Sequence, residues 1–126
     1  MTEPREITYA TAELNTEVER WLRHLGAERR MAAKTLDAYR RDVVQFLAFL
    51  NEHLGERIAL ANLATIEPTD VRAFLSARRA HGISGRSLMR SLAGARSFVR
   101  FLEREGKGKV AALAAIRAPK DRKSVV

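Results

Sequence analysis

Apolar residues recur at spacings of three and four along most of this sequence, and that period is typical of helices with one buried face. Strands would instead show alternating β-branched residues, and no such run is found. Ala, Leu, Arg and Glu, which favour helix, are abundant, whereas the 126 residues include only seven glycines and three prolines. The sequence therefore predicts an all-α fold, and its length is enough for one domain.

The apolar stripes and capping residues predict a compact bundle of four main helices plus a short C-terminal helix. We expect the main helices at about 11–27, 34–54, 68–81 and 85–105, and the short one at 110–116. Between the second and third main helices, residues 56–66 are expected to form an extended or single-turn connector. The whole arrangement is one small helical domain.

The flanking segments differ in composition from this domain. Residues 1–6 alternate acidic and basic side chains without an apolar stretch behind them, and residues 1–10 are interpreted as an N-terminal tail. Residues 11–116 form the predicted domain. Residues 117–126 are polar, basic and without periodicity, which is typical of a linker.

The composition also excludes several classes of function. There is no cysteine, so disulfides, thiolate zinc sites and cysteine nucleophiles are ruled out, and three scattered histidines are too few for a metal cage. We therefore expect no metal, no cofactor and no small-molecule substrate. No segment approaches the roughly 20 apolar residues of a membrane span, and the N-terminus lacks a secretory signal. A cytoplasmic location without membrane contact is expected.

Catalytic motifs are not found in the chain. Glu13, Glu17 and Glu19 are expected on the exposed side of the first helix, where carboxylates most often face solvent rather than form a paired acid and base. The sequence contains no glycine-rich phosphate loop and no common nucleophile motif. The chain by itself is therefore expected to catalyse nothing.

A formal charge of +8 and an isoelectric point near 10.8 predict a polyanionic partner. The positive excess lies in two zones, residues 28–41 and the part of the chain from residue 76 onward. Arginine supplies 18 of the 23 basic residues, and its planar guanidinium can pair with phosphate oxygens or guanine edges through two parallel hydrogen bonds. Double-stranded DNA fits this chemistry better than a lipid surface. The alternative is a solvated charged face, which is common on helices.

The helix expected at 85–105 has two opposite faces. Leu88, Leu92, Ala95, Val99 and Leu102 share one side, and Arg86, Arg90, Ser97, Arg100 and Arg104 share the other. In its first turns Arg86 and Arg90 could reach base edges in a major groove, while Ser87 and Ser91 could reach phosphates. Ser91, together with Gly94 and Ala95, also suits close packing against another helix, so both interpretations stay open.

The start of the helix expected at 34–54 is a second candidate site. A helix N-terminus presents unpaired N–H groups, so Lys34, the Thr35 hydroxyl and Arg41 could meet a phosphate there. The alternative is that Thr35 only caps the helix and that Arg41 is solvated. Tyr39 lies on the apolar stripe and is predicted to belong to the core.

Two separated parts of the sequence carry a family resemblance. The first is LRHLGAERRMAAKTLDAYRRD at 22–42 with FLAFL at 46–50, and the second is DVRAFL at 70–75 with RSLMRSLAGARSFVRFL at 86–102 and APK at 118–120. In this order they resemble the core-binding domain of bacterial Xer-type tyrosine recombinases, and RSL at 86–88 with ARSF at 95–98 is closer to the XerC than to the XerD branch. The resemblance covers about 16–123.

The resemblance implies a SAM-like integrase N-terminal domain that grips one face of a recombination half-site while a catalytic domain closes on the other. The candidate DNA contacts that it implies are Lys34, Thr35, Arg41, Arg86, Ser87, Arg90 and Ser91. The linker that crosses the duplex would begin at Lys120, Arg122 and Lys123.

For the intact protein, the resemblance implies DNA breakage and rejoining through a covalent phosphotyrosine, for chromosome dimer resolution and with a second, XerD-like protomer. The nucleophile would lie beyond Val126, because Tyr9 and Tyr39 are the only tyrosines and neither matches its place. Two other functions fit the same sequence. One is a basic helical module that docks an acidic protein, and the other is a stand-alone regulator that occupies recombination sites without cutting them.

Overall fold

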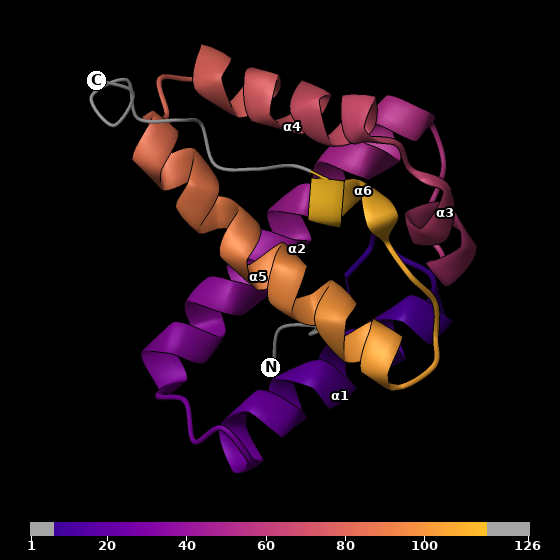
Figure 1. Ribbon diagram of the computed structural model, residues 1–126, viewed down its shortest axis with the longest axis vertical. Coiled ribbons are helices and arrows are strands. Elements are labelled where there is room, and N and C mark those ends of the chain that lie inside the picture. Colours follow the sequence, from indigo (N-terminus) through magenta and orange to yellow (C-terminus); the bar gives the residue numbers. More distant parts are fainter. Residues whose placement is uncertain (1–6, 116–126) are drawn as a thin grey trace.

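The computed structural model describes residues 7–115, and its regular elements are helices (Figure 1). They are α1 (Ala12–Ala27), α2 (Ala33–Leu54), α3 (Leu60–Thr65), α4 (Pro68–Ala80), α5 (Gly85–Arg104) and α6 (Ala111–Ala115). Within this range there is no strand, and a single isolated bridge pairs Ala10 with Ile58. The expected all-α fold is therefore confirmed.

The helix boundaries follow local signals that the sequence displays. α1 begins after Thr11, whose hydroxyl accepts a hydrogen bond from the Leu14 amide, and α5 begins after Ser84, whose hydroxyl accepts one from the Ser87 amide. α2 ends at Leu54 and is followed by Gly55, which has a left-handed φ of 76° that suits glycine. The predicted connector contains α3, a helix of six residues. α6 matches the short helix expected at 110–116 as far as residue 115.

The segment before α1 packs onto the domain, although it was expected to be part of a tail. Ile7 and Ala10 are buried, and the Asn15 amide group bonds to both the N–H and the carbonyl of Ile7. The Thr11 amide donates to the Ile58 carbonyl, and the Ile58 amide donates to the Tyr9 carbonyl. Residues 7–10 therefore belong to the fold, because they satisfy backbone groups of the loop before α3.

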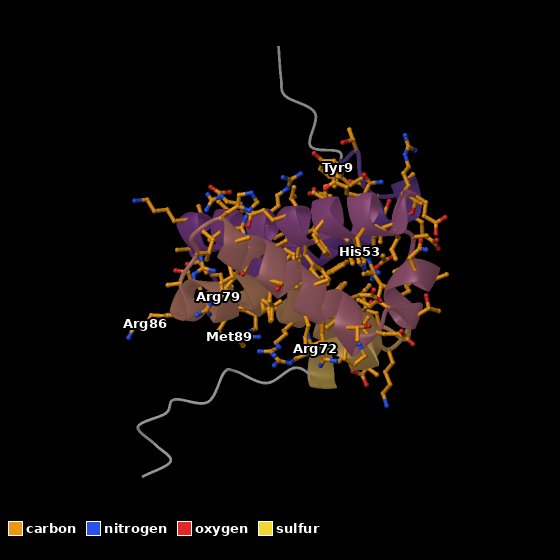
Figure 2. The ribbon with its side chains drawn as sticks, turned by 90° about the horizontal axis from the view of Figure 1, so that it is seen from above. Tyr9, His53, Arg72, Arg79, Arg86 and Met89 are labelled. Atoms are coloured by element: carbon orange, nitrogen blue, oxygen red, sulfur yellow. The ribbon has the colours of Figure 1, made fainter. Side chains whose placement is uncertain are left out.

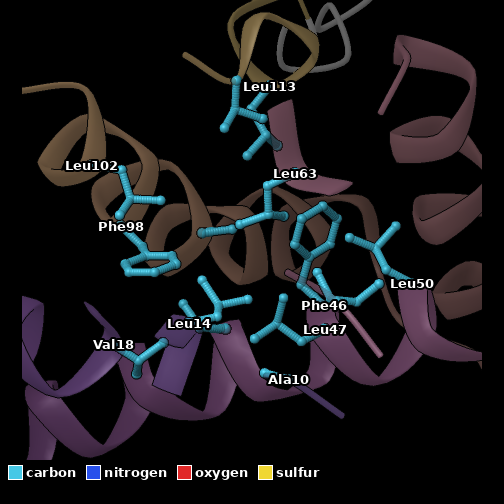
Figure 3. Close-up of a cluster of buried hydrophobic side chains, with 14 of the residues drawn as sticks. Ala10, Leu14, Val18, Phe46, Leu47, Leu50, Leu63, Phe98, Leu102 and Leu113 are labelled. Carbon is cyan, nitrogen blue, oxygen red and sulfur yellow. The ribbon is translucent and has the colours of Figure 1, made fainter. Parts of the chain in front are cut away.

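The hydrophobic core runs through the middle of the bundle and draws on all six helices and the segments that join them (Figure 3). Its largest fully buried side chains are Trp21, Phe74, Leu14, Leu25, Leu47, Leu50, Ile58, Leu63, Leu92, Leu102, Leu113 and Val18. Phe46 and Phe74 meet edge to face with ring centroids 5.1 Å apart, which joins α2 to α4. None of the helices within residues 7–115 has the length and apolar character needed to cross a membrane.

α2 and α5 cross in the centre of the molecule (Figure 1). α5 packs more extensively on α2 than on any other helix. From the crossing, the first half of α2 and the first half of α5 diverge toward the same side, the left of Figure 1. The two N-terminal halves thus form the arms of a V, and both predicted site segments lie on these arms.

Candidate nucleic-acid interface

α5 separates its buried and basic faces much as its sequence predicts. The buried face consists of Leu88, Ser91, Leu92, Gly94, Ala95, Phe98, Phe101 and Leu102. Arg86, Arg90, Arg100 and Arg104 are exposed. Burial, together with the neighbouring positive charge of Arg100, lowers the pKa of the Arg96 guanidinium. One side of α5 is therefore strongly electropositive.

Two serines of α5 that were expected to be accessible on its basic face are instead engaged in contacts within the protein. Ser91 is 7% exposed, and its hydroxyl donates to the Leu88 carbonyl at 2.7 Å. Ser97 was assigned to the exposed face, but its hydroxyl accepts a hydrogen bond of 3.0 Å from the indole N–H of Trp21. Ser91 thus follows the packing alternative, and neither hydroxyl faces open solvent in the way a phosphate contact needs.

The N-terminal turn of α5 presents Arg86 and Ser87 at the surface. Both side chains are exposed, and Figure 2 shows Arg86 projecting away from the body of the molecule. Ser87 stays close to the helix start, because the Ser84 hydroxyl donates to its hydroxyl at 3.2 Å. This turn can therefore offer an extended guanidinium and a hydroxyl to the same ligand.

The N-terminal turn of α2 has no side-chain cap. Its N-cap residue is Ala32, whose side chain has no hydrogen-bond acceptor, and the first turn holds no acidic residue. Thr35 follows three residues later and is exposed, so it does not act as the cap that the alternative interpretation assigned to it. Lys34 and Arg41 are exposed as well. Unpaired amides and positive side chains at a helix start favour an anion there.

A shallow depression joins the two arms of the V. It is lined by Lys34, Thr35, Ala38, Tyr39, Arg90 and Ala93. Tyr39 is only half-buried, and its ring stacks on Trp21 with the centroids 6.2 Å apart, so it forms part of the floor and also touches the core. The structure therefore brings together Lys34 and Thr35 with Arg90, which are far apart in sequence.

Asp42 is a residue of this region that sequence reasoning did not single out. Asp42 is 6% exposed, and one oxygen of its carboxylate accepts hydrogen bonds from the Arg90 guanidinium at 3.0 Å and from the Gly94 amide at 3.2 Å. Burial raises the pKa of the Asp42 carboxyl, and the Arg90 charge and the Gly94 amide only partly oppose that rise. The only sign of this contact in the sequence was Gly94. Its small size indicated close packing against another helix, but it did not identify that helix as α2 or the contacting residue as Asp42.

A second ionic cluster lies between α1 and the end of α5. Glu17, expected on the exposed side of α1, is 5% exposed, and it accepts a hydrogen bond of 2.8 Å from Arg20. Arg20 also bonds to Glu105 at 2.7 Å, and Lys107 lies 3.7 Å from Glu17. The prediction for Glu17 was wrong, because the turn after α5 covers that side of α1. Among the described residues, no group of acidic and histidine side chains is arranged to hold a metal.

The predicted linker residues Lys120, Arg122 and Lys123 lie outside the described residues. The other candidates fall into two groups. Lys34, Thr35 and Arg90 share the depression, whereas Arg41, Arg86 and Ser87 are exposed elsewhere on the same two helices. Thus the fold gathers the candidates of both sequence segments onto two crossing helices, with Ser91 buried.

Comparison with known proteins gives the class of this domain. Residues 18–106 match the family described as phage integrase, N-terminal SAM-like domain. The match includes α2 to α5 in full, and with them the crossing and both arms of the V. The chain belongs to this family.

Its similar relatives are tyrosine recombinases named XerC. That of Bradyrhizobium diazoefficiens is 62% identical over 120 residues, which are 95% of this chain and 37% of the relative. That of Nitrobacter winogradskyi is 60% identical over 92% of this chain and 36% of the relative. That of Rhizobium meliloti is 47% identical over 90% of this chain and 36% of the relative. The resemblance found in the sequence is confirmed, including the closer similarity to XerC.

The chain spans little more than a third of the length of these relatives. The comparison with solved structures gave no match.

Proposed function

We propose that this domain is the DNA-binding domain of a XerC-like site-specific tyrosine recombinase and that it grips a recombination half-site with the two arms of the V. The proposed contacts are Lys34, Thr35, Arg41, Arg86, Ser87 and Arg90. The observation that carries the proposal is the shared depression, in which the uncapped start of α2 lies beside a guanidinium of α5. Phosphate and base edges are both suited to such a surface.

Each arm has a distinct task in this proposal. The amides and positive side chains at the start of α2 bind phosphate and fix the position of the domain on the duplex. The first turns of α5 enter the major groove, which is about 12 Å wide and admits a helix. Arg86 projects away from the body of the molecule and does not line the depression, so it reaches the DNA backbone or a base edge beyond it (Figure 2).

The remaining part of the recombinase supplies the chemistry. The relatives are called tyrosine recombinases, and by analogy the intact protein cuts and rejoins DNA through a phosphotyrosine formed outside this chain. We propose that residues 117–126, with Lys120, Arg122 and Lys123, link the domain to that catalytic part across the duplex. A second protomer of XerD type, chromosome dimer resolution at cell division and a cytoplasmic location complete the proposal.

The Arg86→Ala variant tests the proposed contact. Loss of a guanidinium that touches DNA should weaken half-site binding by roughly tenfold, and it should reduce the salt dependence of binding if the contact is to phosphate. Arg57→Ala is the matched control. It removes the same charge, but Arg57 is exposed beyond the C-terminal end of α2, away from the arms of the V. Equal effects of both substitutions on fluorescence anisotropy titrations would show that only net charge matters and would contradict the assigned surface.

A further inference from the structure

The crossing of α2 and α5 is built around a single carboxylate. Gly94 approaches α2 so closely that a Cβ atom on it would lie 2.7 Å from the Asp42 Cβ and 2.7 Å from the Tyr39 carbonyl oxygen. The Gly94 amide and the Arg90 guanidinium both donate to the Asp42 oxygen that faces them. The Asp42 carboxylate is therefore packed against Gly94, and it is hydrogen-bonded to two residues of α5 that lie four positions apart.

Stability alone does not explain a charge at this place. Removing a carboxylate from water is unfavourable, and an apolar residue of similar volume usually packs as well or better in a helix interface. The pKa of Asp42 is raised because burial outweighs the favourable contacts with Arg90 and Gly94. Burial thus disfavours the charged form of Asp42, and the ion pair with Arg90 forms at a cost in stability.

Arg90 combines a fixed end with an exposed one. Its Nη1 atom is bonded to Asp42 at 3.0 Å, yet 53% of its side chain remains exposed. The other donors of its guanidinium, which has five N–H groups in a planar fork, are left for a ligand in the depression beside Lys34 and Thr35. Arg86, by contrast, forms no ion pair with the residues that the structure describes.

We propose that Asp42 is a positioning residue, which orients the Arg90 guanidinium so that Arg90 can contact a base edge. Asp42 thereby contributes to the selectivity of DNA binding rather than to its strength. The proposal rests on the proposed function of the domain. A bidentate contact to a base edge requires a fixed guanidinium plane, and an arginine that is already held loses less freedom on binding. A phosphate contact has no such requirement, and the negative charge of Asp42 weakens attraction to any phosphate.

The Asp42→Asn variant tests this role. Asparagine keeps an oxygen that can accept from the Gly94 amide but removes the charge that holds Arg90. Binding to a scrambled duplex should stay equal or become tighter, whereas the preference for a Xer-type half-site over the scrambled duplex should fall by roughly five- to tenfold. Asp37→Asn is the control, because it makes the same charge change at an exposed position of α2. It should leave the preference unchanged.

A double-mutant cycle separates positioning from a structural effect. In an Arg90→Ala background, Asp42→Asn should cause no further loss of preference, because the residue that Asp42 orients is gone. Thermal unfolding of each variant, followed through the fluorescence of Trp21, verifies that the domain stays folded. An Asp42→Asn chain that keeps the wild-type preference, or one that loses it equally with and without Arg90, overturns the inference. A wild-type chain without any preference overturns the proposed function and this inference together.

Discussion

Gly94 shows how one residue controls the geometry of the site. It lies inside a regular helix, where glycine lowers stability relative to alanine by roughly 0.5–1 kcal/mol. The structure gives the reason for its presence, since any side chain there would meet Asp42 and the Tyr39 carbonyl at 2.7 Å. α2 and α5 can therefore approach each other this closely at their crossing only because residue 94 has no side chain.

The Gly94→Ala substitution should destabilise the domain by about 1–3 kcal/mol, because the added methyl group forces α2 and α5 apart. Urea denaturation followed by Trp21 fluorescence measures the change, and Trp21 is well placed because it is fully buried. Gly85→Ala provides the comparison in the same helix. There the nearest atom to a new Cβ is the end of the flexible Arg79 side chain at 3.5 Å. A similar loss in both variants would mean that helix packing is not the cause.

The contacts that individual side chains make across the fold were the hardest part of the structure to predict from the sequence. Periodicity gives the direction of a side chain around its helix, and on that basis the exposure of Arg86, Arg90 and Lys34 is as expected. It does not show which neighbour arrives from elsewhere in the chain. The Ser97 hydroxyl accepts a hydrogen bond from the Trp21 indole, and Glu17 is covered by the turn after α5. Both side chains are therefore less exposed than predicted. The Asp42 pair with Arg90 joins residues 48 apart in sequence, which no local pattern reveals.

At the scale of elements, the helices were predictable because their signals are local. Apolar stripes span each of α1, α2, α4 and α5, and Thr11, Gly55, Pro68 and Ser84 mark ends that agree with the structure. α3 has six residues, of which only Leu63 is buried, so it is too short to show a period. The crossing of α2 with α5, in contrast, depends on contacts between distant segments and could only be suspected from the small residues of α5.

The start of α4 gives a test of how an element is held. Asp70 accepts a hydrogen bond of 2.8 Å from the Glu67 amide, and its other oxygen lies 3.0 Å from the His53 ring nitrogen. The Glu67 amide, followed by His53, lowers the pKa of the Asp70 carboxyl. A carboxyl whose pKa is lower in the folded than in the unfolded chain stabilises the fold above its unfolded pKa of about 3.9 and loses that contribution as the pH falls through its folded pKa.

The Asp70→Asn variant should therefore be less stable than the wild type at pH 7, by roughly 0.5–1 kcal/mol as for other charged groups at helix starts. The difference should shrink as the pH is lowered below about 4, where the wild-type carboxyl takes up a proton. Urea denaturation of both chains at several pH values between 7 and 3 measures it. A difference that does not change with pH would show that the charge of Asp70 has no part in it.

At the scale of the whole molecule, the candidate DNA contacts lie on one side of the crossing of α2 and α5. The arms of the V carry Lys34, Arg41, Arg86 and Arg90, while the other side of the crossing is closed by the core and by the ionic cluster around Glu17. The relatives are about two and a half times as long as this chain. This shape and charge fit the recognition role that we propose for the domain, and the same proposal places the cutting and rejoining of DNA outside residues 1–126.

We propose above all that the arms of the V recognise a DNA sequence. A measured affinity alone does not test this, because a basic helical domain binds any duplex through charge, with dissociation constants of about 10⁻⁴ to 10⁻⁶ M. The most direct measurement is fluorescence anisotropy of the chain with a labelled Xer-type half-site and with a scrambled duplex of equal length, at two salt concentrations. We expect a preference for the half-site that persists at the higher salt concentration. Equal binding to both duplexes that disappears with salt would contradict the claim and would leave a basic helical module without sequence recognition.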